Sequence, residues 1–148
     1  MLLSDLSSLY NRDLHTLRKE IEAFKQEADL WHTLPGITNS AGNLSLHLCG
    51  NLRHYIGHVL GSEDYVRDRP KEFSTTGLPM AELLAEVDRT IASVERGFAK
   101  LGQVQMEAPF PVPLPVESSS TGHFLLHLFG HLGWHLGQIN YLRRILES

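Results

Sequence analysis

Hydrophobic side chains recur at alternating intervals of four and three residues in the N-terminal part of the chain. The series consists of Tyr10, Leu14, Leu17, Ile21, Phe24, Ala28 and Trp31. This spacing places all of these side chains on one face of a helix, while charged residues occupy the other faces. The pattern predicts an amphipathic helix from about Ser4 to Trp31, which the Pro35-Gly36 pair would end.

Two further segments are predicted to form long helices. The second helix would run from about Asn39 to Leu60, with Asn39 or Ser40 as its N-cap and Gly61 as its stop. The third would start at Pro79, a favoured first residue, and it repeats the same alternation. Its hydrophobic positions are Met80, Leu84, Val87, Ile91, Val94, Phe98 and Leu101.

A fourth predicted helix opens at the Ser118–Thr121 cluster, which offers several N-caps, and runs to Leu146. The 25 residues from Ser118 to Leu142 contain no Asp, Glu, Lys or Arg, and this length could span a bilayer. Four histidines, Gln138 and Asn140 lie within it, however, and polar groups are costly in lipid. We therefore expect a buried central helix and no association with a membrane.

The connectors complete the predicted architecture. The segment of 18 residues from Gly61 to Leu78 is charged, rich in turn residues and long enough to cross a small bundle. Alternate prolines from Pro109 to Pro115 keep the last connector extended. Four amphipathic segments without a strand pattern predict an all-α fold, a four-helix bundle that forms a single domain over residues 1–148.

Composition excludes several classes of function. A net charge of −4 argues against nucleic-acid binding, which needs a basic surface. A single cysteine, Cys49, excludes an intramolecular disulfide and a zinc site built mainly from thiolates, and we expect it in the core. The first ten residues have no basic region followed by a long apolar stretch, so we expect a cytoplasmic protein without a signal peptide.

Histidine is unusually abundant, with nine residues against six aspartates and four lysines. Seven of the nine lie in two short windows, which contain His47, His54 and His58, and then His123, His127, His131 and His135. Two histidines four residues apart on a helix can bind one metal ion from the same face. Each such step rotates by about 40° around the axis, so only one adjacent pair of the fourth helix can face a given ion. The natural site combines one pair from the fourth helix with one histidine from the second.

The direction of the two helices decides which histidines meet. If the second and fourth helices are antiparallel, His47 lies level with His131 and His135. If they are parallel, either His58 would meet that pair or His47 would meet the first pair of the fourth helix. The residues alone favour neither arrangement strongly. Gln138 and Asn140 are candidate hydrogen-bond partners for imidazole N–H groups.

Two segments resemble the DinB/YfiT-like superfamily of metalloenzymes. The segment HLGWHLGQINYLRR, residues 131–144, resembles its last helix, in which an H-x-x-x-H pair precedes x-G-Q. The segment NLSLHLCGNLRHY, residues 43–55, resembles its second helix, which carries a third histidine ligand. Residues 30–40 are similar to a subgroup whose members are mostly uncharacterised.

This resemblance implies an up-down-down-up course with a long crossover between helices 2 and 3. It implies a divalent metal ion, usually nickel or zinc, held by His47, His131 and His135. Leu136 stands where many relatives have arginine, which affects a local polar contact and not the ligands. The resemblance also implies a homodimer. Some members of the superfamily are thiol transferases or thiol-dependent isomerases, so a low-molecular-weight thiol is a candidate cofactor.

Three neutral imidazoles leave a coordination position open, which is typical of a catalytic site. We therefore expect a divalent-metal-dependent enzyme, a thiol-dependent transferase or a hydrolase, that acts on a small-molecule substrate. One alternative is a non-catalytic, metal-binding, stress-linked dimer, because no acid, base or nucleophile besides the metal is evident. Another is a purely structural helical module. Of the remaining histidines, His54, His58, His123 and His127 are expected to line the cavity or lie on the surface. His15 and His32, which have no partner at ligand spacing, are expected to be hydrogen-bonded residues of the core or its rim.

Overall fold

The computed structural model describes residues 3–148, and all regular structure in this part of the chain is helical. This confirms the predicted all-α class. In chain order the elements are α1 (Leu3–Glu22), the 3-10 helix η1 (Glu27–Trp31), α2 (Ala41–Leu52), the π-helical segment η2 (Arg53–Leu60), α3 (Arg69–Ser74), α4 (Met80–Ala99), α5 (Gln103–Glu107) and α6 (Thr121–Leu146).

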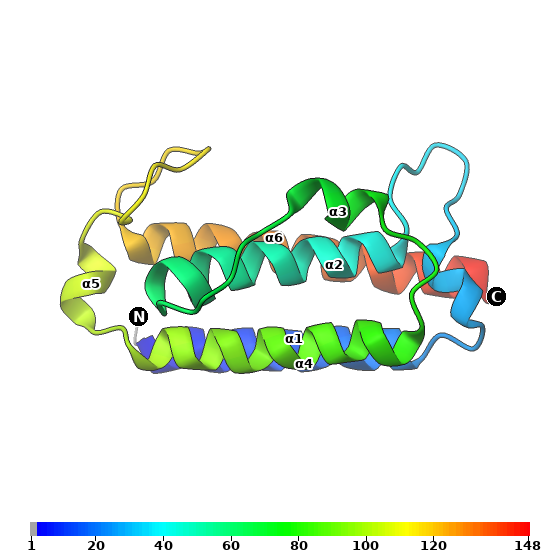
Figure 1. Cartoon of the computed structure of the whole chain (residues 1–148), viewed down its shortest axis with the longest axis horizontal. Helices are drawn as coiled ribbons and strands as arrows, with labels where there is room; N and C mark the ends of the chain where they lie inside the picture. Colours follow the sequence, from blue (N-terminus) through cyan, green and yellow to red (C-terminus); the bar gives the residue numbers. More distant parts are fainter. Residues whose placement is uncertain (1–2) are drawn as a thin grey trace.

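The long helices lie side by side along the longest axis of the molecule (Figure 1). Helix α1 packs against α4 and α6, and α2 packs against the same two neighbours. The short helix α3 lies on the outer side of α2, and α5 lies at the end of the molecule where α6 begins (Figure 1). The elements that carry the two histidine windows, α2 with η2 and α6, are therefore direct neighbours.

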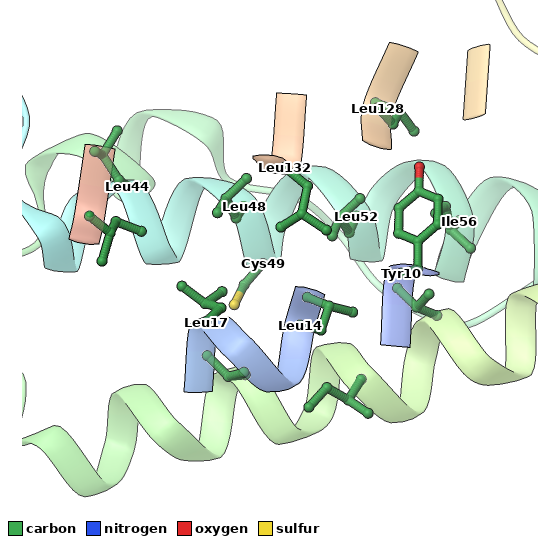
Figure 2. Packing of buried hydrophobic residues seen from close by; sticks show 14 of the residues in the cluster. Tyr10, Leu14, Leu17, Leu44, Leu48, Cys49, Leu52, Ile56, Leu128 and Leu132 are labelled. Atoms are coloured by element: carbon green, nitrogen blue, oxygen red, sulfur yellow. The ribbon is translucent and has the colours of Figure 1, made fainter. Parts of the chain in front are cut away.

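A continuous hydrophobic core fills the space between these helices. Tyr10 is fully buried in it, and its hydroxyl donates a hydrogen bond of 2.6 Å to the carbonyl of Leu125. This bond satisfies a polar group whose burial would otherwise be costly. Cys49 points from α2 into the same cluster, toward Leu17 of α1 (Figure 2), which confirms its predicted place in the core. The core thus fixes the rotation of α2, and with it the direction in which His47 points.

The predicted end of the first helix is wrong. Helix α1 stops at Glu22, and the hydrophobic series continues into the separate helix η1. The cause is a distant residue, because Glu147 Oε2 accepts hydrogen bonds from the backbone N–H groups of Lys25 (2.7 Å) and Gln26 (2.9 Å). These N–H groups would otherwise continue the helix. Phe24 and Leu30 remain buried on either side of the break.

The predicted starts of the later helices agree with the structure. Ser40 caps α2 by accepting the N–H of Asn43, and Ser120 caps α6 by accepting the N–H of His123. Pro79 immediately precedes α4. The segment that follows α2 becomes π-helical up to the stop at Gly61, which shifts its side chains around the axis relative to a regular α-helix.

Two expectations about the rest of the chain need correction. The connector from Gly61 to Leu78 is not simply an irregular linker, because it contains α3, which is capped by the Asp68 side chain. Helix α6 is not buried on all sides, since Trp134 is 70% exposed and Tyr141 is 66% exposed. Within residues 3–148, no helix has both the length and the apolar character needed to cross a membrane.

Candidate metal centre

Three imidazoles from two helices converge at one point of the α2–α6 interface. Each of His47, His131 and His135 offers a ring nitrogen that lies within 4.8 Å of those offered by the other two. The ring centroids of the three pairs are 4.5 to 5.3 Å apart. Within the described residues this is the one group of His, Cys, Asp and Glu side chains with the spacing of a metal site.

The closest pair has almost the separation that a shared metal ion requires. His47 Nε2 lies 3.0 Å from His131 Nε2. Two nitrogens that each lie about 2.1 Å from one tetrahedral ion are about 3.4 Å apart. The two rings therefore need only a small adjustment to bind the same ion.

A buried carboxylate fixes the orientation of His47. Its Nδ1 lies 2.9 Å from Glu72 Oε1, and both side chains are more than nine-tenths buried. Because a carboxylate only accepts hydrogen bonds, Nδ1 carries the proton and the Nε2 lone pair faces the other imidazoles. This is the arrangement that orients a histidine toward a metal ion.

The carboxylate belongs to Glu72 of α3, and Gly50 of α2 leaves room for it. Arg67 holds the other side of Glu72 through Nε to Oε2 (2.8 Å) and Nη2 to Oε1 (2.9 Å). Burial disfavours the charged form of Glu72, but the hydrogen bonds from His47 and Arg67 outweigh it, and the pKa of Glu72 is lowered. A Cβ at Gly50 would collide with Glu72 Oε2, so the glycine permits this close approach.

His135 is oriented by a side chain of its own helix. Its Nδ1 lies 2.7 Å from Gln138 Oε1, an acceptor, so Nδ1 carries the proton and Nε2 is free to bind a metal ion. This supports the predicted role of Gln138, whereas Asn140 bonds to Glu20 of α1 instead. His131 differs from both, because its Nδ1 is buried and has no hydrogen-bond partner among the residues that the structure describes.

The electrostatics favour neutral imidazoles at this point. Burial, followed by the proximity of His135 and His47, lowers the pKa of His131 to about 4. Burial also lowers the pKa of His135. Metal ions bind the neutral form of histidine, so two of the three rings are held in the form that coordination requires. The donor set and its protonation therefore fit a divalent metal ion.

The other histidines do not join this cluster. His15, His32, His58, His123 and His127 are exposed and His54 is partly buried. His58 Nδ1 contacts the carbonyl of Glu63, and His123 Nδ1 accepts the N–H of Ser119. His127 stacks on Phe124 and lines a cavity beside the cluster. The expectation that His54, His58, His123 and His127 line the cavity or lie on the surface agrees with these positions. His15 and His32 are hydrogen-bonded, as expected, to Asn11 and Asp29, but they lie on the exposed surface and not in the core.

Two cavities of similar size flank the three imidazoles. The first, of about 430 Å³, is lined by His135 and Gln138 together with Leu34, Gly36, Ile37, Thr38, Asn39, Leu44, Tyr141, Leu142 and Ile145. The second, of about 440 Å³, is lined by His47 and His131 together with Asn51, Tyr55, Arg67, Arg69, Pro115, Phe124, His127 and Leu128. Both volumes lie in the range of small-molecule sites.

Sequence reasoning missed Arg67 and Glu72, which lie in the connector between η2 and α4. Asp68 followed by Pro70 is a helix-start signal that could have revealed α3. No local signal places Glu72 beside His47, because that contact arises only when α3 packs on α2. The carboxylate at this site is therefore a product of tertiary structure.

One of the comparisons with known proteins gives a match. No curated protein and no solved structure matches the chain. The family model of the DinB superfamily matches residues 9–139, which include both histidine windows and most of the described helices. The chain therefore belongs to the DinB superfamily.

Proposed function

We propose that this protein is a divalent-metal-dependent enzyme that acts on a small molecule, with His47, His131 and His135 as the ligands of nickel or zinc. The observation that carries the proposal is the convergence of three ring nitrogens, all within 4.8 Å of one another, between two cavities. Three protein ligands leave at least one position for water or substrate.

The course of the chain supports this assignment. Tyr10 contacts Leu125 and Glu20 contacts Arg143, so α1 and α6 run in the same direction. Residue numbers fall along α6 as they rise along α2, since Leu44 shares a cavity with Leu142, and Asn51 shares one with Phe124. We interpret these contacts and Figure 1 as a four-helix bundle with an up-down-down-up course, in which the α3 segment is the crossover.

When bound, the metal ion would polarise a substrate group and lower the pKa of a bound water or thiol. The chain's own residues supply orientation and shape. Glu72 keeps the proton of His47 on Nδ1, and Gln138 does the same for His135. The two cavities beside the cluster would hold the reacting molecules.

Two reaction types fit this arrangement. A thiol-dependent transferase would place a low-molecular-weight thiol in one cavity and its co-substrate in the other, whereas a hydrolase would place the two halves of one substrate there. No Asp or Glu lines either cavity. Cys49 is buried in the core, which raises its pKa to about 12, so it does not serve as the nucleophile. Any thiol in the reaction would therefore come from a cofactor.

A non-catalytic metal-binding dimer is the second candidate, and one observation favours it. Helix α6 exposes large apolar side chains, among them Trp134, Tyr141 and Ile145. Positions 130, 133 and 137 on the same helix are glycines at which an added Cβ would meet nothing within 4 Å. Such a face suits a second copy of the chain, as a homodimer requires.

Elemental analysis of gently purified protein tests the metal assignment. We expect one nickel or zinc ion per chain, and we expect His135→Ala to lose it. His123→Ala is the matched control, because His123 lies on the same helix but outside the cluster, and it should keep the metal. Wild-type protein that takes up no divalent ion, even after reconstitution, would refute the proposed function. A thiol-dependent turnover that disappears in His135→Ala would favour the enzyme over the non-catalytic dimer.

A further inference from the structure

The cavity beside His47 and His131 has the features of a site for one chemical class of ligand. We infer that it binds a small organic anion, specifically a carboxylate that also carries a second hydrogen-bond acceptor, such as a hydroxyl, and an apolar group. This inference rests on the proposed function, because it assigns a substrate class to the same centre. Two arginines, an unpaired amide and the apolar walls of the cavity support it.

Two arginines bring positive charge to the cavity. The Arg69 side chain is exposed, and its guanidinium lies 5.2 Å from the centre of the Phe73 ring, so an aromatic face holds it in place. It takes part in no ion pair with the residues that the structure describes. Arg67 uses Nε and Nη2 to hold Glu72, which leaves Nη1 for a ligand. Because an arginine fork matches a carboxylate in shape and charge, these two side chains favour an anion.

No negative charge opposes an anion along the cavity wall. Its lining contains no Asp or Glu, and its histidines contribute no negative charge. Glu72 lies behind His47 and Arg67 and is only 6% exposed. The other cavity has no charged Asp, Glu, Lys or Arg in its lining. The contrast between the two cavities assigns the anion to the side of His47.

An unpaired amide indicates a second polar contact. Asn51 is only 8% exposed, it lines this cavity, and its buried Oδ1 has no hydrogen-bond partner among the described residues. Buried polar atoms in folded proteins almost always have a partner, and leaving one unpaired is costly. Oδ1 itself has no exposed surface, so a ligand in the cavity would meet the other end of the amide, where Nδ2 can donate to a hydroxyl or carbonyl oxygen.

The remaining wall is apolar. Tyr55, Phe124 and Leu128 line it, and the rings of Tyr55 and Phe124 pack edge to face with centroids 5.0 Å apart. This rigid aromatic surface offers contact area to a ring or a short hydrocarbon chain. The cavity therefore combines an anion site, the amide donor of Asn51 and an apolar wall, which together define the ligand class.

Isothermal titration calorimetry with three matched probes tests this inference. Mandelate carries the carboxylate, the hydroxyl and the ring. Mandelamide removes the charge, and phenylacetate removes the hydroxyl. Each probe is titrated into zinc-loaded protein and into protein kept metal-free by a chelator, so that binding to the cavity is separated from binding to the metal.

We expect mandelate to bind both forms. Mandelamide should bind at least about tenfold more weakly, since a charge-assisted arginine contact is lost. Arg69→Gln should weaken mandelate by about the same factor, and Arg69→Lys should restore part of the affinity. Arg89→Gln is the matched control, because it removes the same charge from an exposed site outside the cavity, and it should have no effect.

The Asn51 contact has its own test. Asn51→Leu should weaken the binding of mandelate but not that of phenylacetate, because only mandelate places a hydroxyl oxygen against Nδ2. Equal binding of mandelate and mandelamide to wild-type protein would overturn the inference, and so would a complete lack of mandelate binding. Mandelate that binds only the zinc-loaded form, with no change in Arg69→Gln, would also overturn it. Metal-free protein that binds mandelate selectively but never takes up metal would instead refute the proposed function alone.

Discussion

The His123/His127 pair and the His131/His135 pair have the same spacing on the same helix, yet only the second pair meets a third imidazole. His123 is exposed and contacts the backbone at the start of α6, and His127 stacks on Phe124. His131 and His135 face His47 across the interface with α2. The spacing of two histidines is therefore not sufficient for a metal centre, because an opposing helix must also supply a third ring in a fixed orientation.

Replacing one histidine of each pair should give the largest difference in zinc affinity. We expect His131→Ala to lower zinc affinity by more than about 100-fold, since loss of a ligand exceeds the loss caused by removing an outer partner. His127→Ala should leave the affinity unchanged. Competition with a chromophoric chelator measures both values. Equal losses in the two variants would remove the distinction between the pairs.

The orientation of His47 can be tested through its carboxylate partner. Glu72→Gln keeps the size of the side chain but removes the charge that holds the Nδ1 proton and Arg67. We expect zinc affinity to fall by about 10- to 100-fold, the usual effect of changing a hydrogen-bond partner of a ligand. Glu82→Gln on the exposed side of α4 is the control. Unchanged affinity in Glu72→Gln would show that His47 is oriented without Glu72.

Two glycines offer a further contrast between the helices. Gly50→Ala should displace Glu72 and destabilise the fold by about 1–3 kcal/mol, as overpacking of a filled site does. Gly133→Ala on α6 meets no neighbour within 4 Å, and it should stabilise the fold by about 0.5–1 kcal/mol through helix propensity. Urea unfolding of both variants provides the comparison. A stable Gly50→Ala protein with unchanged zinc affinity would contradict the proposed fit of Glu72.

The smallest expected effect concerns pH. Burial, with the neighbouring imidazoles, lowers the pKa of His131 to about 4 from 6.5. Between these values the unfolded chain binds a proton that the folded chain does not, so metal-free protein should lose stability as the pH falls through this range. Above pH 6.5 His131 is neutral in both the folded and the unfolded state, so this loss of stability is absent. His131→Gln should lose less stability between pH 7 and pH 5, whereas the exposed His32→Gln should behave like wild type in urea unfolding at both values.

Much of the helical framework could be predicted because its signals are local. Ser40, Pro79 and Ser120 mark helix starts through their own backbone contacts or conformational preference, and the structure uses all three. The end of α1 could not be predicted in this way. Its interruption depends on Glu147, which is more than one hundred residues away in the chain.

In the candidate site, too, the features with local signals could be predicted and those that depend on tertiary contacts could not. The His131/His135 pair and the contact from Gln138 follow from helix periodicity, so the sequence indicates them directly. The choice of His47 depended on the direction of α2 relative to α6, which periodicity leaves open. The contribution of α3 was missed because Arg67 and Glu72 look like ordinary charged residues of a connector until the segment packs on α2.

X-ray absorption spectroscopy at the zinc edge of the metal-loaded protein would count the imidazole ligands of the proposed centre. The proposed centre predicts three imidazole nitrogens at about 2.0–2.1 Å and one additional light atom from water or substrate. His47→Ala should reduce the imidazole count by one. A spectrum with a sulfur ligand, or with the same imidazole count in wild type and His47→Ala, would contradict the three-histidine centre.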